Sequence, residues 1–304
     1  MSLLQLNEML PSDTGLPGAP AQSVASAIRY DRPDASVADW FTAYHHYEVP
    51  QAAADERTSW ILPGTAYIRL MLRIDGPTAV TIGGRHIDPV PQYALYGPTS
   101  KAMEVREGGG VTIGFGISAL GWARLTRWRA SDLHNQVTPA ERMLGAGVAE
   151  RLAAELATVP AEQLKPALDR LLPDLLGPPN PDEAILRGLT TMILENSFAE
   201  IGEVATRLGV EPHALRRLSL RYFGMTPKVL LRRARFLRSY QRVTRLSAAT
   251  DYRAIDPSYY DVSHFLRDAH TFLGMTPRHF HLLQRPQCEA ALRACMPLSG
   301  TAQG

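Results

Sequence analysis

The sequence predicts an α+β protein of two domains, a β-rich domain in the N-terminal half and an all-α domain in the C-terminal third. Three observations lead to this prediction. Residues 27–118 consist of short runs rich in Val, Ile and Tyr, which turn residues separate. Residues 120–176 and 184–286 instead repeat apolar residues at intervals of three and four, the helical period. With 304 residues, the chain is also long enough for two hydrophobic cores.

The N-terminal runs are expected to form six or more short strands: AYHHYEV, TAYIRLMLRI, TAVTIG, QYALYG, KAMEVRE and VTIGFGI. Glycine-containing turns follow several of them, with DG at 75, GG at 83 and GGG at 108. Short strands at this spacing predict a small barrel or a sandwich. Two or three helices are expected to follow the strands, in residues 120–176.

Changes in composition predict the domain boundaries. Residues 1–26 mix Pro, Gly, Ser and Ala without periodicity, so we expect a flexible arm there. The β-rich domain with its helices then covers 27–176. GPPNPDE, at 177–183, reads as a linker. The helical domain covers 184–286, and a tail covers 287–304.

Positive charge is concentrated in the helical domain. Residues 197–286 carry a net charge of +8 and the rest of the chain −6, although the whole chain has only +2. Fourteen of the 15 cations in this segment are Arg, whose planar guanidinium suits bidentate contacts with phosphate and guanine. The charge distribution therefore indicates a nucleic-acid partner.

The helical domain contains an internal repeat. The tetrapeptide GMTP begins at Gly224 and again at Gly274, within the related phrases FGMTPKVLLRR and FLGMTPRHFH. In each copy Gly is expected to end one helix, and Thr and Pro to begin the next. Fifty residues correspond to one three-helix unit with its connection, so two related modules are predicted.

The segment EVATRLGVEPHALRRLSLRYFGMTP has the layout of a helix-turn-helix. A short helix leads to a turn around Gly209, and a second helix begins near Glu211. Leu215 and Leu218 are expected to face the core of the module. This leaves four polar side chains facing outward, in position to read base edges or bind phosphate: His213, Arg216, Arg217 and Arg221. The alternative is an amphipathic helix whose basic face is merely solvated.

These motifs resemble the AraC family of transcription regulators, whose C-terminal module holds two helix-turn-helix units joined by a long helix. The resemblance covers residues 197–283 and rests on AxRLGVxPxxLRRL with GMTP, and on YYDVSHFLR at 259–267 with the second GMTP. It implies binding to double-stranded DNA. The base-reading positions that it implies are His213, Arg216 and Arg217 in the first unit, and Val262, Ser263, Leu266 and Arg267 in the second. Lys228 and Arg278 complete the predicted DNA-binding set.

The sequence also departs from the family pattern. Ser219 and Ala269 stand where an apolar residue, often Phe, is usual, and Pro257 and Ser258 interrupt the segment before YYD. Proline disfavours helix just before it. We therefore expect the second unit to be shortened, mobile or weak on DNA. The alternative function is a ligand-binding or interaction protein with a degenerate DNA module.

The N-terminal half resembles the partner domain of AraC regulators in WILPGTAYIRLMLRI, YGPTSKAMEV and GFGISALGWARLT. This resemblance implies a cupin-like barrel followed by helices, which serves effector binding, dimerisation or both. Its aromatic residues either line a pocket for an apolar effector or form ordinary core. The candidate pocket residues are Trp40, Tyr44, Trp60, Tyr67 and Tyr93.

No catalytic or metal-binding residues and no cofactor are predicted, so the chain is not expected to be an enzyme. The β-rich half has only His45, His46 and His86, and adjacent residues such as His45 and His46 point to opposite faces of a strand. GISAL around Ser118 lacks the second glycine of a nucleophile elbow.

The expected partners are double-stranded DNA and a small-molecule effector of unknown identity. A second copy of the chain is a candidate partner, and RNA polymerase is another if the protein is an activator. The sequence has neither an export signal nor an apolar run of membrane-spanning length, so we expect a cytoplasmic protein without a membrane partner.

Overall fold

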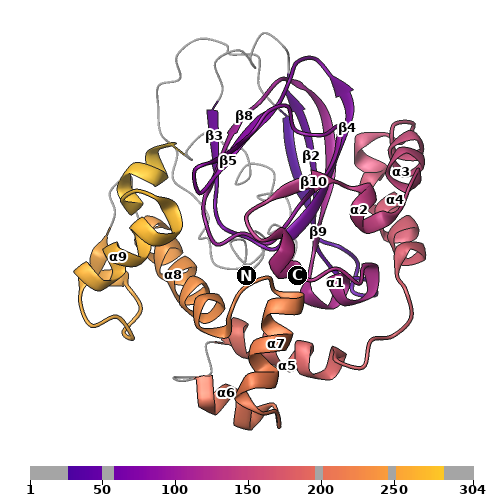
Figure 1. Cartoon of the computed structure of the whole chain (residues 1–304). Coiled ribbons are helices and arrows are strands. Elements are labelled where there is room, and N and C mark those ends of the chain that lie inside the picture. Colours follow the sequence, from indigo (N-terminus) through magenta and orange to yellow (C-terminus); the bar gives the residue numbers. More distant parts are fainter. Residues whose placement is uncertain (1–26, 50–57, 196–200, 246–250, 284–304) are drawn as a thin grey trace, which may run out of the picture.

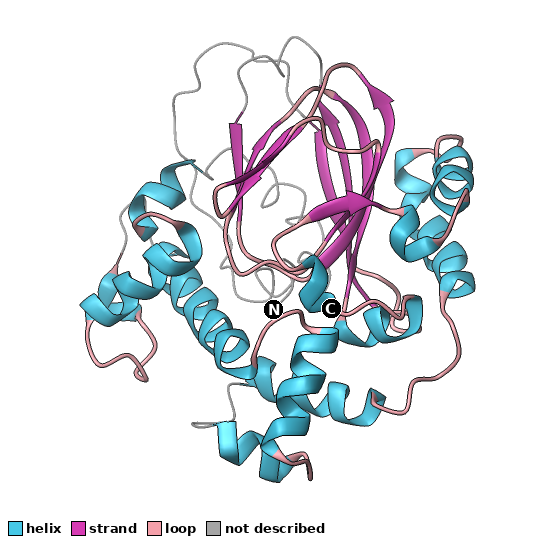
Figure 2. Cartoon of the chain, in the orientation of Figure 1, coloured by secondary structure: helices cyan, strands magenta, loops and turns pink. Residues whose placement is uncertain are grey.

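The computed structural model describes residues 27–49, 58–195, 201–245 and 251–283 (Figures 1 and 2). Its N-terminal part contains two antiparallel sheets. The six-stranded sheet has the order β1 (Ala27–Asp31), β2 (Phe41–Val49), β9 (Gly110–Ile117), β4 (Ala66–Ile74), β7 (Tyr93–Tyr96) and β10 (Val137–Pro139). The four-stranded sheet has the order β3 (Thr58–Ile61), β8 (Met103–Arg106), β5 (Ala79–Ile82) and β6 (Arg85–Ile87). The predicted α+β class is thus confirmed.

The expected closed barrel is wrong for the described residues. β3 and β6 each pair with one neighbour within their own sheet, so no strand pairing joins the two sheets. The space between the sheets is partly filled by Val80, Met103 and Tyr96, which belong to one apolar cluster. The arrangement is therefore two facing sheets, and strand propensity alone does not determine whether such sheets close.

Short helices cover the outer face of the six-stranded sheet (Figure 1). Ile68 and Leu70 of β4 belong to the same core cluster as Leu152 and Leu168 of these helices, while the alternating residues of β4 face the other sheet. The α-helices are α1 (Ala119–Leu125), α2 (Glu141–Leu144), α3 (Val148–Leu156) and α4 (Leu164–Leu171), with 3-10 turns η3 (Ala130–Leu133), η4 (Ala161–Gln163) and η5 (Leu172–Leu175).

The C-terminal part is all-α in the described ranges. It comprises α5 (Glu183–Glu195), α6 (Ile201–Arg207), α7 (Pro212–Tyr222), α8 (Pro227–Arg245) and α9 (Val262–Leu273), with further helical residues at 277–283. Gly224 and Gly274 both have φ of +78°, a conformation that glycine adopts without strain, and a helix begins three residues after each. The predicted role of the GMTP repeat is thus confirmed. None of the helices in these ranges is long and apolar enough to cross a lipid bilayer.

The second helix-turn-helix unit is incomplete in the described residues, as the sequence predicts. Whereas α6 precedes α7 in the first unit, residues 251–261 before α9 contain only a 3-10 turn, η6 (Tyr252–Ala254). The buried Asp256 orders this segment, because its carboxylate accepts hydrogen bonds from the backbone N–H and hydroxyl of Ser258 at 3.0 and 2.7 Å. Pro257 lies between them and cannot donate to a helical hydrogen bond.

The N-terminal domain contacts the second unit directly. Ala102, next to β8, shares an apolar cluster with Phe272 of α9, and its N–H donates to the Phe272 carbonyl at 2.7 Å. The ring of Trp60 in β3 meets that of Phe280 edge-on, with centroids 6.0 Å apart. The four-stranded sheet and its loops therefore pack against α9 and the helix that follows it.

Arg233 of α8 joins the two domains. Its side chain is buried, and one terminal nitrogen donates to the carbonyls of Gly64 at 2.9 Å and Thr99 at 2.5 Å. Burial lowers the pKa of Arg233 to about 10, so the side chain stays charged at neutral pH. The Thr99 N–H also donates to the Gly64 carbonyl, so Arg233 binds a junction where two loops already meet.

We expect Arg233→Ala to lower the free energy of unfolding by about 1–3 kcal/mol, because buried carbonyl groups lose their charged donor. Urea unfolding measures the loss, and hydrogen exchange should rise in residues 62–65 and 97–102. Arg170→Ala is the control, since Arg170 is exposed on α4 and pairs with Glu155 at 3.5 Å. Equal effects of the two substitutions would show that Arg233 does not hold the domains together.

Candidate nucleic-acid interface

The helices α6 and α7 form the predicted helix-turn-helix. Val204 and Ala205 of α6 are buried, and the close approach of the two helices there needs a small side chain. Gly209 has φ of +64° in the turn, and the Val210 N–H donates to the Ala205 carbonyl at 3.0 Å. Pro212 occupies the first turn of α7, where a missing N–H costs nothing.

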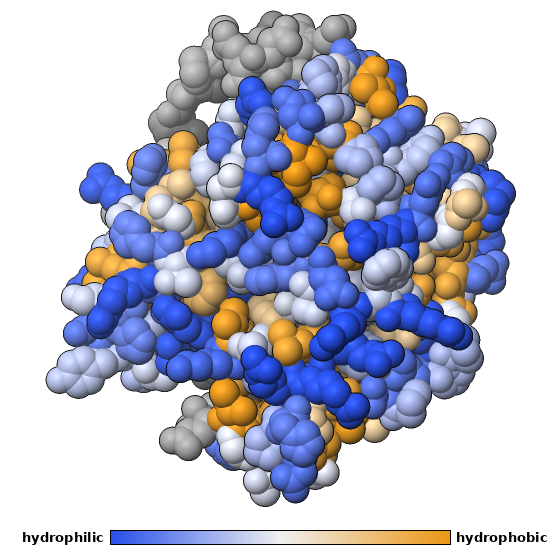
Figure 3. Space-filling model, in the orientation of Figure 1, coloured by the Kyte–Doolittle hydropathy of each residue, from blue (hydrophilic) through white to orange (hydrophobic). Residues whose placement is uncertain are grey.

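The predicted base-reading residues of α7 lie on its exposed side. Leu215 and Leu218 are buried in the core as expected. The four side chains predicted to contact DNA are all exposed: His213, Arg216, Arg217 and Arg221. In Figure 3, hydrophilic side chains dominate the lower half of the surface, over the C-terminal helices.

Ser219 is accommodated by a hydrogen bond. It is fully buried at a position where the family usually has an apolar residue, and its hydroxyl donates to the Met225 carbonyl at 2.7 Å. A buried hydroxyl that is satisfied in this way carries little penalty. The first unit therefore stays intact with Ser219 in its core, and the hydrogen bond joins α7 to the turn that leads into α8.

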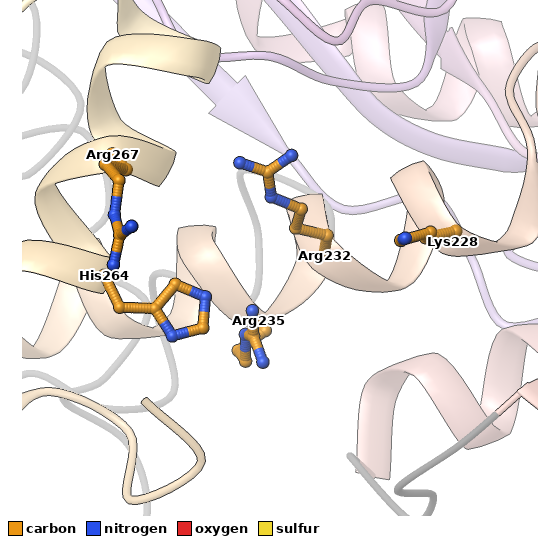
Figure 4. A pocket seen from close by; sticks show the side chains of 5 residues that line it. All are labelled: Lys228, Arg232, Arg235, His264 and Arg267. Carbon is orange, nitrogen blue, oxygen red and sulfur yellow. The ribbon is translucent and has the colours of Figure 1, made fainter. Parts of the chain in front are cut away.

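A basic hollow of about 410 Å³ lies between α8 and α9 (Figure 4). Three of its lining residues are on α8 and two on α9: Lys228, Arg232, Arg235, His264 and Arg267. The sequence prediction included Lys228 and Arg267 and missed the other three. The signal was present, because Lys228, Arg232 and Arg235 follow one another at the i+4 and i+3 spacing that aligns side chains on one helix face.

A buried carboxylate organises this hollow. Asp268 of α9 is fully buried, and Arg232 donates from Nε to its Oδ1 at 2.6 Å. The Tyr259 hydroxyl donates to Oδ2 at 2.7 Å, and Arg235 lies 3.6 Å from the same oxygen. The guanidinium of Arg235 also lies over the Tyr259 ring, 4.3 Å from its centroid. Asp268 thereby fixes α9 on α8 and orders two of the five basic side chains.

The rest of the predicted set in the second unit is spread over α9 and the following helix. Asp261 caps α9 by accepting from the His264 N–H at 2.6 Å, which sets the start of the helix. Val262, Ser263 and Arg267 are exposed, whereas Leu266 is half-buried. Arg278 is exposed on the helix after the second GMTP and does not line the hollow.

The predicted effector pocket is not assembled as expected. Trp40, Tyr44 and Tyr93 pack against the core under the N-terminal helices, and Trp60 packs against the C-terminal domain. Tyr67 alone among the five lies between the sheets. The placement of the other four agrees with the alternative, ordinary core, since ring size does not indicate which face of a strand a residue occupies when the register is unknown.

The inner face of the six-stranded sheet carries a polar and aromatic cluster instead. Tyr67 stacks on Tyr96 with centroids 4.3 Å apart, and Arg69 donates to the Tyr96 hydroxyl at 3.3 Å. His45 lies beside them over Gly114, where a Cβ atom would come within 2.1 Å of its ring. Burial, and secondly Arg69, lower the pKa of His45 to about 3. Arg69 forms no ion pair with the described residues, which also hold no metal-binding group of three or more His, Cys, Asp or Glu side chains.

We expect Asp268→Ala to destabilise the protein by about 3 kcal/mol, because Arg232 and Tyr259 lose their buried partner. Asp268→Asn should cost less, since the amide oxygen still accepts one hydrogen bond. Urea denaturation of the full chain measures both values. Asp132→Ala, an exposed carboxylate on η3, is the control. A loss at Asp268 no greater than at Asp132 would refute the role of the network.

Comparison with known sequences and structures finds only distant similarity to this chain. No protein-family model matches the sequence, and no curated protein matches it. Among solved structures, an apo variant of ToxT from Vibrio cholerae aligns with 84% of this chain and 100% of its own, at 10% identity and a TM-score of 0.45. ToxT from Vibrio cholerae O395 aligns with 85% of this chain and 97% of its own, at 9% identity and a TM-score of 0.42.

A third structure is the AraC-like transcriptional activator CuxR, which aligns with 70% of this chain and 87% of its own, at 16% identity and a TM-score of 0.24. TM-scores this low do not indicate a function, so the function is inferred from the residues and the geometry of the chain itself.

Proposed function

We propose that this chain is a sequence-specific DNA-binding transcription regulator of the AraC type, whose N-terminal domain responds to a small molecule. The observation that carries the proposal is the basic hollow between α8 and α9, lined by four cationic side chains and a histidine. Phosphate groups are the ligands that such a surface suits, because Lys and Arg neutralise them and release counterions.

The exposed arginines of α7 supply the sequence-specific part of the proposal. Arg216 and Arg217 project from a helix whose opposite side is fixed in the core by Leu215 and Leu218. A guanidinium on a rigid helix can donate two hydrogen bonds to the major-groove edge of guanine. The first unit would therefore read bases, while the hollow beside α8 positions the DNA backbone.

We expect Arg216→Ala or Arg217→Ala to weaken binding to a specific duplex by about 1–3 kcal/mol and to relax sequence preference at one base pair. Fluorescence anisotropy with matched and altered duplexes at fixed salt measures this. Arg85→Ala, exposed on β6, should leave affinity unchanged. Failure of the unmodified chain to bind any duplex would favour the alternative, a ligand-binding or interaction protein with a degenerate DNA module.

The cluster around Arg69 is the proposed effector site, in place of the aromatic set predicted from the sequence. Arg69 has no carboxylate within ion-pair distance among the described residues, although the charge of Glu107 acts on it from farther away, and Tyr67, Tyr96 and His45 surround it with aromatic surface. A molecule with an apolar or aromatic body and a carboxylate matches both features.

We expect aromatic and long-chain carboxylic acids to raise the melting temperature of the chain, and their methyl esters to have little effect. Arg69→Met should remove the difference between acid and ester, because the guanidinium no longer binds the carboxylate. A thermal-shift comparison of acid and ester pairs measures this. Equal stabilisation by acids and esters would refute a carboxylate-binding role for Arg69.

A further inference from the structure

The loop between α1 and η3, residues 126–129, belongs to the N-terminal domain, and η3, which follows it, packs against α7. Ala130 and Leu133 share an apolar cluster with Leu218 and Tyr222 of α7. Gly224, directly after α7, is so close that a Cβ atom there would lie 3.0 Å from the Ala130 carbonyl oxygen. The loop therefore leads directly into a turn that contacts the end of the recognition helix.

Polar contacts fix the residues before the loop to α5 and to the segment that leads into it. Arg124 donates to both carboxylate oxygens of Glu183, at 2.6 and 2.9 Å, and Glu183 begins α5. The amide of Asn180 donates to the Ala123 carbonyl at 3.2 Å, and the Tyr222 hydroxyl donates to Asp182 at 2.7 Å. The loop is thus fixed at one end by α5 and the segment before it, and at the other end by the contact of η3 with α7.

The loop presents positive charge that forms no ion pair with the described carboxylates. Arg127, Trp128 and Arg129 are exposed, and within the described part of the chain neither arginine forms an ion pair. Arg142 adds a third guanidinium, 4.3 Å from the centroid of the Trp128 ring. Some exposed arginines of the domain are paired, for example Arg73 with Asp75 at 3.1 Å, whereas Arg85 and Arg151 form no ion pair with the described residues.

We propose that this loop is a further DNA-binding element, in which Arg127, Arg129 and the Arg142–Trp128 stack bind phosphates beside the major groove that α7 reads. Gly224 follows Arg217 by seven residues, or about 10 Å along a helix axis. Ala130, which follows Arg129, lies against Gly224, so the loop arginines are anchored near the C-terminal end of α7. The major groove is about 12 Å wide, and long side chains at that end of the helix would extend toward the backbone that borders the groove. This inference rests on the proposed DNA-binding function.

The test compares the salt dependence of binding for the full chain and for the double variant Arg127→Ala, Arg129→Ala, on a duplex selected with the unmodified chain. Two lost phosphate contacts should reduce the slope of log K against log salt by about 2. Affinity should fall by a similar factor on specific and unrelated duplexes, because phosphate contacts carry no sequence information. Replacement of both residues by Lys should restore most of the slope.

The matched control is Arg85→Ala, Arg151→Ala, which removes two exposed arginines on β6 and α3 and should leave the slope almost unchanged. If the unmodified chain binds its duplex and the loop variant keeps the full slope, the inference is overturned while the proposed function stands. An equal reduction of slope by the control variant also overturns it, because net charge alone would then explain the effect. If the unmodified chain binds no duplex, both proposals fail.

Discussion

The interface between the C-terminal helices and the N-terminal domain is the constraint on which the rest of this structure depends. Arg233 lies at its centre, a buried cation satisfied by backbone carbonyls from two loops of the other domain. Apolar contacts flank it on both sides, with Leu218 and Tyr222 near α1 and with Trp60 and Ala102 near α9. Both helix-turn-helix units are therefore oriented by one domain.

This interface explains how α9 stays ordered although the second helix-turn-helix is incomplete in the described residues. The described residues before α9 contain no α-helix of the kind that supports α7 in the first unit. Two other structures hold α9: the Asp268 network on α8, and the four-stranded sheet through Trp60 and Ala102. That sheet also faces the cluster around Arg69, so the proposed effector site and the helix proposed to bind DNA lie on opposite sides of one sheet.

The sequence predicted the features that local physics determines. Glycine and proline in the GMTP repeat fix where helices end and begin, and the spacing of Leu215 and Leu218 fixes the exposed side of α7. Features that depend on distant contacts were missed. Trp60 packs against Phe280, more than 200 residues away, and nothing near it in sequence indicates this. The helical spacing places Asp268 at a buried position, where a carboxylate is unusual. The spacing does not indicate that Arg232 and Tyr259 are its partners.

The proposed function depends most on α7, whose exposed arginines lie on a helix fixed in the core by Leu215 and Leu218. Selection of bound sequences from a random duplex pool, with the full chain at near-physiological salt, tests this function most directly. We predict at least one enriched segment that α7 reads in the major groove, and a second segment centred about 10 base pairs away would add a base-reading role for α9. Binding without any enriched sequence would contradict the proposed function.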